Sequence, residues 1–207
     1  MSDTELRLGA RLNLLPDPAL AELRPALAEH LERFGSSITV PQFQALLTPL
    51  TRQVLERGFA EAGAHEGTVW LADATGESLQ PAHNTGPDAA RVVGAFKQPL
   101  KSGLICMVYA SEQAFLENDV SRNSEQSKLL DSLLQVETLA MVAVPFYFLR
   151  ACRGVVSCVQ LKRTGVAGPE TPGFRPEHLD TIQRTAALLS QLIEFRILSQ
   201  AVGWSSE

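Results

Sequence analysis

The 207-residue chain is poor in aromatic residues and in cysteine, and both shortages narrow the range of proteins it can be. Aromatic side chains make up only 6% of the residues, so a core must be built mainly from Leu, Val and Ala. No two of the three cysteines, Cys106, Cys152 and Cys158, have the C-x-x-C spacing of zinc sites and thioredoxin chemistry. We expect them to be buried thiols in a protein of the reducing cytoplasm.

An excess of basic residues and long hydrophobic runs are also lacking. The net charge of -5 argues against a general nucleic-acid-binding protein and against a polybasic protein of membrane surfaces. The most apolar window, 139–149, is about half of the roughly 20 residues that a membrane helix needs. The N-terminus mixes acids with bases and does not resemble a signal peptide. The sequence therefore predicts a soluble cytoplasmic protein without nucleic-acid or membrane partners.

Motifs of the common enzyme classes are missing too. The sequence contains no G-x-S-x-G, no P-loop and no G-x-G-x-x-G. The four histidines are scattered, and the pair His65-Glu66 lacks the second His of H-E-x-x-H. We therefore expect neither catalytic residues nor a metal site.

The first 65 or so residues have helical character. Asp17-Pro18 is an N-cap followed by proline, and apolar residues then recur every three or four positions. Pro25 predicts a kink or a break in this helix. A second helix is predicted to start near Thr39, with a bend at Pro49.

From residue 67 onward the pattern changes to one of strands mixed with helices. Strands are expected at 68–73, 79–85, 114–117, 139–148 and 154–163. Helices are expected at 124–134 and from 176 to about 201, whereas 104–110 fits either a helix or a strand. This order of elements predicts an α+β fold with an antiparallel sheet.

The final helix is apolar on more than one face. One stripe contains Leu179, Ile182, Ala186, Leu189, Ile193 and Ile197, and a second contains Leu188, Leu192, Phe195 and Leu198. A single contact with a sheet cannot bury both stripes. We expect the second stripe to pack against the N-terminal helices or against a second subunit.

Several segments between residues 67 and 197 together resemble a GAF domain, closest in pattern to the regulatory modules of cyclic-nucleotide phosphodiesterases and bacterial adenylyl cyclases. They include G-T-V-W-L-A-D, S-G-L-I-C-M-V-Y-A, F-L-E-N-D-V, G-V-V-S-C-V-Q-L and F-R-P-E-H-L-D-T-I. The resemblance implies a six-stranded antiparallel sheet with the terminal helices on one face. Short helices and loops would cover a small-molecule pocket on the other face. The implied division is a helical extension at 1–38, a GAF domain at 39–202 and a tail at 203–207.

The resemblance also implies which residues form the pocket. They are Asn84, Thr85, Leu104, Ile105, Asp131, Thr138 and Gln160, and strand alternation adds Cys158 to the side of Gln160. In cyclic-nucleotide-binding members the phosphate lies on backbone amides that here belong to Leu104 and Ile105. The alternative for these two residues is a purely structural place in the core.

Some positions depart from the cyclic-nucleotide pattern. Leu134 stands where that subfamily has a Thr, and a Leu side chain donates no hydrogen bond. The N-K-F-D-E motif of the subfamily is degenerate, with Arg163 and Thr164 at its Asn and Lys positions. These departures argue against cGMP or cAMP. The ligand stays unidentified, and no covalently bound cofactor is expected.

The resemblance implies a non-catalytic, stand-alone sensory or regulatory module that forms a homodimer through its terminal helices and signals to another protein in trans. A ligand-free dimerisation or scaffold protein is the first alternative. Free methionine-(R)-sulfoxide reductases also use this fold with three cysteines, but their Trp-x-Gly-Phe-Tyr and G-V-C-G segments are absent from this sequence. A reductase is therefore the weaker alternative.

Overall fold

The computed structural model describes residues 18–163 and 171–201, so the predicted tail at 203–207 and residues 1–17 of the predicted extension lie outside the described residues. The helices of the described chain are α1 (Pro18–Ser37), α2 (Val40–Leu46), α3 (Pro49–Glu61), α4 (Ala89–Val92), α5 (Leu104–Ser111), α6 (Leu129–Leu134) and α7 (Pro176–Ala201). The strands are β1 (Glu66–Ala72), β2 (Ser78–Asn84), β3 (Gln98–Pro99), β4 (Phe115–Glu117), β5 (Val136–Phe148) and β6 (Ala151–Arg163).

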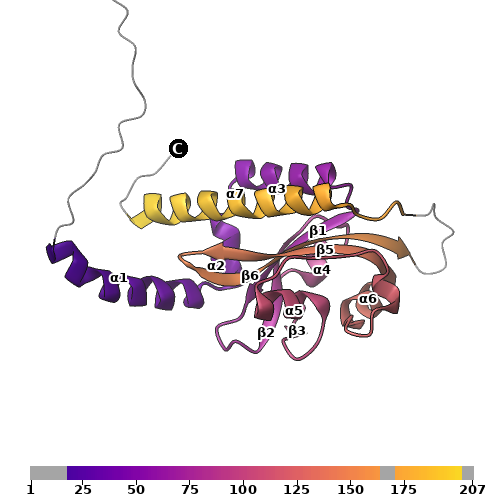
Figure 1. Ribbon diagram of the computed structural model, residues 1–207, viewed down its shortest axis with the longest axis horizontal. Coiled ribbons are helices and arrows are strands. Elements are labelled where there is room, and N and C mark those ends of the chain that lie inside the picture. Colours follow the sequence, from indigo (N-terminus) through magenta and orange to yellow (C-terminus); the bar gives the residue numbers. More distant parts are fainter. Residues whose placement is uncertain (1–17, 164–170, 202–207) are drawn as a thin grey trace, which may run out of the picture.

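The strands form one antiparallel sheet in the order β3-β2-β1-β6-β5-β4 (Figure 1). The predicted turn joins β1 to β2, and there the Asp73 carboxylate accepts hydrogen bonds from Thr75 Oγ1 at 2.9 Å and Ser78 Oγ at 2.6 Å. At the other hairpin, Leu149 and Arg150 join β5 to β6 with φ values of 49° and 68°. Two left-handed residues in succession are typical of the type I′ turn, whose twist matches that of the strands. The predicted α+β fold with a six-stranded antiparallel sheet is confirmed.

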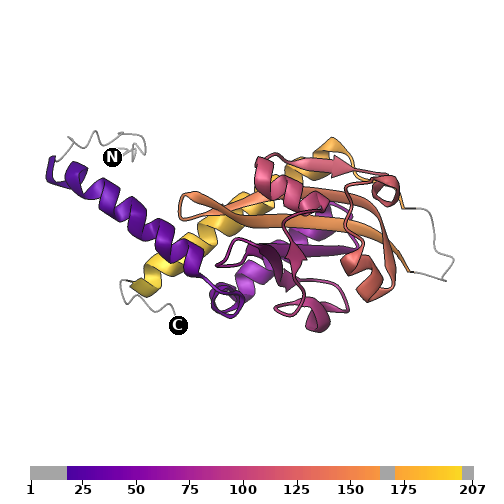
Figure 2. The same cartoon turned by 90° about the horizontal axis from the view of Figure 1, so that it is seen from below.

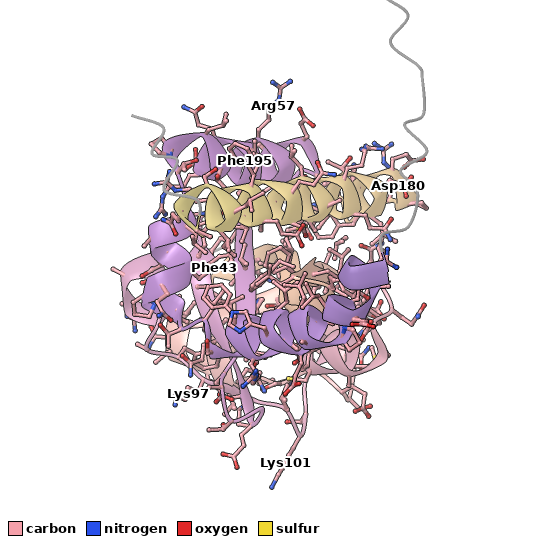
Figure 3. All side chains as sticks on the ribbon, turned by 90° about the vertical axis from the view of Figure 1, so that its left-hand side faces the viewer. Phe43, Arg57, Lys97, Lys101, Asp180 and Phe195 are labelled. Carbon is pink, nitrogen blue, oxygen red and sulfur yellow. The ribbon has the colours of Figure 1, made fainter. Side chains whose placement is uncertain are left out.

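Helices cover both faces of the sheet (Figures 1 and 2). α2, α3 and α7 lie on one face, and the short helices α4, α5 and α6 lie on the other. Phe43 of α2 is fully buried between the helices and the sheet (Figure 3), with its ring centroid 5.9 Å from that of Phe146. A second, smaller core on the opposite face contains Trp70 and Leu104. This arrangement confirms the predicted layering, with long helices on one side and short helices and loops on the other.

Proline and threonine residues set the boundaries of the N-terminal helices. α1 runs through Pro25 as one helix, so the predicted break does not occur. The bend predicted at Pro49 is a full interruption, with α2 ending at Leu46 and α3 starting at Pro49. Thr48 caps α3, because its Oγ1 accepts a hydrogen bond from Thr51 N at 3.1 Å.

The elements on the face of the sheet covered by α4, α5 and α6 differ most from those predicted from the sequence. The ambiguous segment 104–110 is helix α5, which begins after Gly103 at a φ of 111° that only glycine adopts readily. The helix predicted at 124–134 is shorter than expected and starts only at Leu129. It ends at Gln135, whose left-handed φ of 55° turns the chain directly into β5.

The final helix, α7, buries one apolar stripe and exposes part of the other. Ile182, Leu189 and Ile193 are fully buried against the sheet and its neighbouring helices. Leu188, Phe195 and Leu198 are exposed, the last two by 60% and 61%. The N-terminal helices of the same chain therefore leave much of the second stripe uncovered. Among residues 18–163 and 171–201, no helix has the length and apolar character required to cross a membrane.

Candidate functional site

A cavity of about 60 Å³ lies between the sheet and helices α5 and α6. Its apolar lining is contributed by Trp70, Pro81, Val92, Leu104, Ile105, Leu130, Leu134, Val136, Met141, Val159 and Leu161. Its polar lining is contributed by Glu66, Thr68, Asn84, Gln98, Gln126, Ser127, Asp131, Thr138 and Ser157. The cavity therefore has apolar walls interrupted by a limited number of polar groups, as small-molecule sites usually do.

Five of the eight residues predicted for a pocket line this cavity. They are Asn84, Leu104, Ile105, Asp131 and Thr138. Leu104 and Ile105 are also core residues, exposed by only 1% and 6%. Leu104 and Ile105 therefore belong to the hydrophobic core and also line the cavity, so both interpretations given for them in the sequence are compatible with the structure.

Asp131 and Thr138 are bonded to each other. Because Gln135 reverses the chain after α6, the start of β5 returns beside the helix. Thr138 N donates to Asp131 Oδ2 at 2.9 Å, and Thr138 Oγ1 donates to Asp131 Oδ1 at 2.8 Å. The carboxylate thus fastens α6 to the start of β5 while lining the cavity.

The prediction that Gln160 and Cys158 face the pocket is wrong. Both side chains lie on the opposite face of β6, and Cys158 belongs to the core formed with the long helices. Gln160 Nε2 donates to Gly63 O at 3.1 Å, and Gln160 Oε1 accepts from Gly173 N at 3.0 Å. Gln160 therefore satisfies buried backbone groups of two loops on the helix side.

Thr85 also lies outside the cavity lining. Its Oγ1 accepts a hydrogen bond from Gly67 N at 2.8 Å, which ties the end of β2 to β1. Asn84 does line the cavity, but its amide is held by the protein. Asn84 Nδ2 donates to Thr68 Oγ1 at 2.9 Å, and Asn84 Oδ1 accepts from Gly86 N at 2.7 Å.

The lining residues that sequence reasoning missed include Trp70, Gln98 and Ser157. Trp70 Nε1 donates to Ser157 Oγ at 2.9 Å, and both side chains are buried. Ser157 lies one position before Cys158 and so occupies the face that alternation assigned away from the pocket. A buried polar residue on each face of β6 left the orientation of this strand undecided in the sequence.

The cavity lining carries negative but no positive side chains. Its ionisable groups are the carboxyl groups of Glu66 and Asp131, and no Lys, Arg or His of the described chain belongs to the lining. Arg91 of α4 approaches the outside of α6, where its guanidinium donates to Leu133 O at 3.2 Å. Within the two described ranges, no cluster of His, Cys, Asp and Glu residues is suited to hold a metal ion.

The cysteines do not have the environment of reactive thiols. Burial raises the pKa of Cys106 to about 11 and that of Cys158 to about 12. Burial also raises the pKa of Cys152. The thiolate is the reactive form, so these shifts oppose nucleophilic chemistry near neutral pH.

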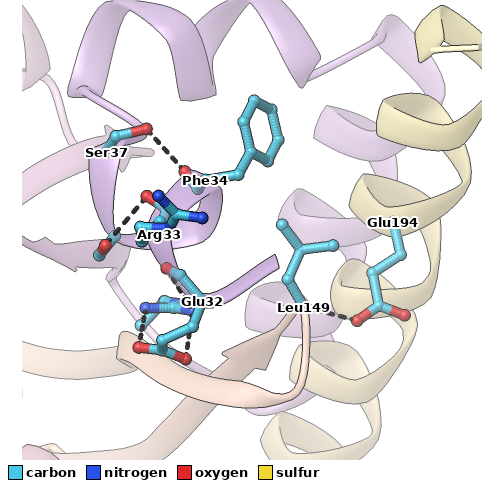
Figure 4. Close-up of polar contacts among 8 residues, drawn as sticks. Glu32, Arg33, Phe34, Ser37, Leu149 and Glu194 are labelled. Atoms are coloured by element: carbon cyan, nitrogen blue, oxygen red, sulfur yellow. Dashed lines mark hydrogen bonds and ion pairs between the residues drawn. The ribbon is translucent and has the colours of Figure 1, made fainter. Parts of the chain in front are cut away.

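Beyond the cavity, the β5–β6 hairpin contacts both terminal helices (Figure 4). Arg153 of β6 forms a bidentate pair with Glu32 of α1, with Nη1–Oε1 and Nη2–Oε2 distances of 3.0 and 2.9 Å. Leu149 N, at the tip of the hairpin, donates to Glu194 Oε1 of α7 at 2.7 Å. Two of the strands that line the cavity, β5 and β6, therefore also hold α1 and α7 through their hairpin.

Comparison with known proteins identifies the fold. No family model and no curated protein sequence matches the chain. Among solved structures, residues 122 to 287 of a methyl-accepting chemotaxis protein match with a TM-score of 0.57 at 20% identity, covering 84% of this chain and 99% of that one. The GAF domain of a Coxiella burnetii phosphoenolpyruvate-protein phosphotransferase matches with a TM-score of 0.57 at 14% identity, covering 90% and 99%. The GAF-B domain of Mycobacterium smegmatis DevS matches with a TM-score of 0.54 at 16% identity, covering 73% and 95%.

These matches extend over nearly the whole of each solved domain, although the sequences have diverged widely. The GAF resemblance seen in the sequence and the sheet order seen in the structure agree with them. The chain therefore has the fold of a GAF domain.

Proposed function

We propose that the chain is a sensory or regulatory module that binds a small molecule between its sheet and helices α5 and α6. The observation that carries this proposal is the cavity, which combines apolar walls with a few polar groups on the face opposite the long helices. The fold shared with the GAF domains of DevS and of a phosphoenolpyruvate-protein phosphotransferase, and with a segment of a methyl-accepting chemotaxis protein, supports a regulatory role.

Helix α6 is the element that would adjust to a ligand. It has six residues, none of which is buried. Its described attachments include the Asp131–Thr138 hydrogen bonds and the bond from Arg91 to Leu133 O. A molecule of a few heavy atoms fits a cavity of about 60 Å³, and a larger ligand requires α6 to move outward.

Ligand occupancy would reach the terminal helices through β5 and β6. Thr138 and Met141 of β5 and Ser157 of β6 line the cavity. The same strands continue into the hairpin, where Arg153 holds α1 and Leu149 holds α7. A ligand changes the packing of these helices only if it binds one packing arrangement more tightly than another.

The output would come from a homodimer whose interface is formed by α1 and α7. α1 extends away from the sheet (Figure 2), and its residues 21–30 are all exposed. Leu23, Leu27 and Phe34 form an apolar stripe on this helix, exposed by 60%, 56% and 44%. A helix that packs so little against its own domain is only marginally stable in water. In a dimer with twofold symmetry, the same apolar stripe of the second copy would pack against it.

Screening by thermal shift and amide NMR tests the ligand site. We expect a bound small molecule to perturb the amides of Leu104, Ile105 and Thr138. Enlarging Leu134 to Trp should abolish the perturbation by filling the cavity. Perturbations confined to the helix side of the sheet would contradict the proposal.

Light scattering tests the dimer. The chain has a mass of 22.5 kDa, and we expect twice this value in solution. Phe195→Glu and Leu27→Glu should return the mass to that of a monomer. Met107→Glu is the matched control, because Met107 is exposed by 42% but lies on α5, on the cavity side. A monomeric wild type would contradict the dimer.

A ligand-free scaffold is the second candidate, and the small volume of the cavity favours it. The two functions are separated by the screen, since a scaffold would dimerise without responding to any compound. A methionine-sulfoxide reductase is disfavoured by the raised thiol pKa values.

A further inference from the structure

The polar groups of the cavity restrict the chemistry of its ligand. Building on the proposed function, we infer that the cavity takes a small organic cation, an amine with hydrogen-bond donors on an apolar body, and rejects anions such as phosphates. The inference depends on the charge of Asp131, the free acceptor of Gln98 and the apolar wall provided by Trp70.

Asp131 supplies a negative charge that forms no ion pair with a basic side chain in the described part of the chain. The ion pairs found among the described residues do not include it, and no described basic side chain lines the cavity. Each of its two carboxylate oxygens accepts one hydrogen bond from Thr138. A carboxylate oxygen has capacity for a further donor, so an ammonium group can bind without displacing these bonds.

Gln98 adds a neutral acceptor to the same lining. The residue is buried, with only 3% of its surface exposed. Nε2 donates to Ser102 O at 2.9 Å and to Pro99 O at 3.3 Å, which fixes the orientation of the amide. No hydrogen bond within the described part of the chain reaches Oε1, so this oxygen is available to a donor group of a ligand in the cavity.

Among the described residues that line the cavity, those at the N-terminus of α5 favour an anion instead. Leu104 and Ile105 are the first residues of this helix and line the cavity. The helix dipole is equivalent to about half a positive charge there. The full negative charge of Asp131 exceeds it, so a phosphate in the cavity would meet net repulsion.

Trp70 completes the site for a cation with an apolar body. Its indole N–H is already bonded to Ser157 Oγ at 2.9 Å, so the ring offers the ligand an aromatic surface rather than a donor. An aromatic face attracts a cation and also packs against hydrocarbon.

Three molecules of equal size test the charge preference: butylamine, 1-butanol and butyrate, titrated at neutral pH and followed by amide NMR. We expect butylamine to bind at least ten times more tightly than butyrate, with 1-butanol between them. In Asp131→Asn, the preference for butylamine over 1-butanol should fall about tenfold, as expected for loss of a charge-assisted hydrogen bond. Glu137→Gln, which removes a nearby exposed carboxylate outside the lining, should leave the preference unchanged.

The ratio of the affinity for butylamine to the affinity for 1-butanol separates a loss of electrostatic attraction from a change in folding. A merely structural effect of Asp131→Asn lowers the affinity for butylamine and 1-butanol together, which would overturn the assigned role of the carboxylate. Butyrate binding as tightly as butylamine to the wild type would overturn the ligand class while leaving the cavity as a binding site. If none of the three binds and the wider screen also finds no ligand, the proposed function itself fails.

Discussion

Arg153 and Glu32 form an ion pair whose two halves differ in burial, and we predict that removing each half costs a different amount. The Arg153 side chain is 8% exposed, whereas that of Glu32 is 58% exposed. In Glu32→Ala the buried guanidinium loses its carboxylate, and breaking a buried pair in this way costs on the order of 3 kcal/mol. In Arg153→Met the remaining carboxylate is hydrated and the aliphatic packing is largely kept, so the free energy of unfolding should fall by only about 1 kcal/mol.

Urea unfolding followed by circular dichroism measures both losses, and hydrogen exchange shows whether they are local to α1. Glu29→Ala is the matched control on the same helix. Its ion pair with Arg33 spans 3.8 Å with both side chains 71% exposed, so its removal should cost less than about 0.5 kcal/mol. The double variant Glu32→Ala/Arg153→Met should be more stable than Glu32→Ala alone. Equal losses for the two single variants would refute the reasoning, and so would a control as costly as Glu32→Ala.

Three further predictions concern packing, pH and thiol reactivity. A Cβ at Gly58 would overlap the Thr185 hydroxyl where α3 approaches α7. Gly58→Ala should therefore lower the free energy of unfolding by about 1 to 3 kcal/mol, seen as a lower melting temperature, and adding Thr185→Ala should restore part of this loss. Burial and the charge of Arg52 lower the pKa of His83 from 6.5 to about 4, so the neutral ring is favoured in the folded state. The contribution of His83 to the free energy of unfolding should therefore have its full value above pH 6.5 and fall by up to about 3 kcal/mol as the pH drops towards 4. A His83→Asn variant whose stability declines equally steeply with falling pH would contradict this. Alkylation at mildly alkaline pH, followed by mass spectrometry, should modify half-buried Cys152 at least ten times faster than Cys158, because Cys158 is completely buried and its pKa is about 12. Similar rates for the two thiols would contradict the environments described here.

Sequence periodicity predicted most of the fold because the local signals and the tertiary environment agree. The alternating strands β5 and β6, the turn after β1 and the long final helix all appear where the pattern indicated. The shortened helix α6 is an exception. Just before the predicted start, the side chain of Asn123 accepts a hydrogen bond through Oδ1 from Glu125 N at 3.0 Å, a local bond that competes with helix formation.

The candidate site was predicted only in part, because alternation identifies the residues that share a face but not the direction of that face. Along residues 155–161 of β6 both faces are apolar with one buried polar side chain each, Ser157 and Gln160. Choosing Gln160 as the pocket residue placed the strand the wrong way round. The deciding contacts come from Gly63 and Gly173, which are far from Gln160 in the sequence and leave no periodic trace there.

Hydrogen exchange with and without a bound ligand tests the central claim most directly. The account predicts that an occupant of the cavity protects α6 and the start of β5, and also changes exchange in α1 and the C-terminal half of α7. Protection confined to the helix-side core, or a cavity response that leaves α1 and α7 unaltered, would contradict it.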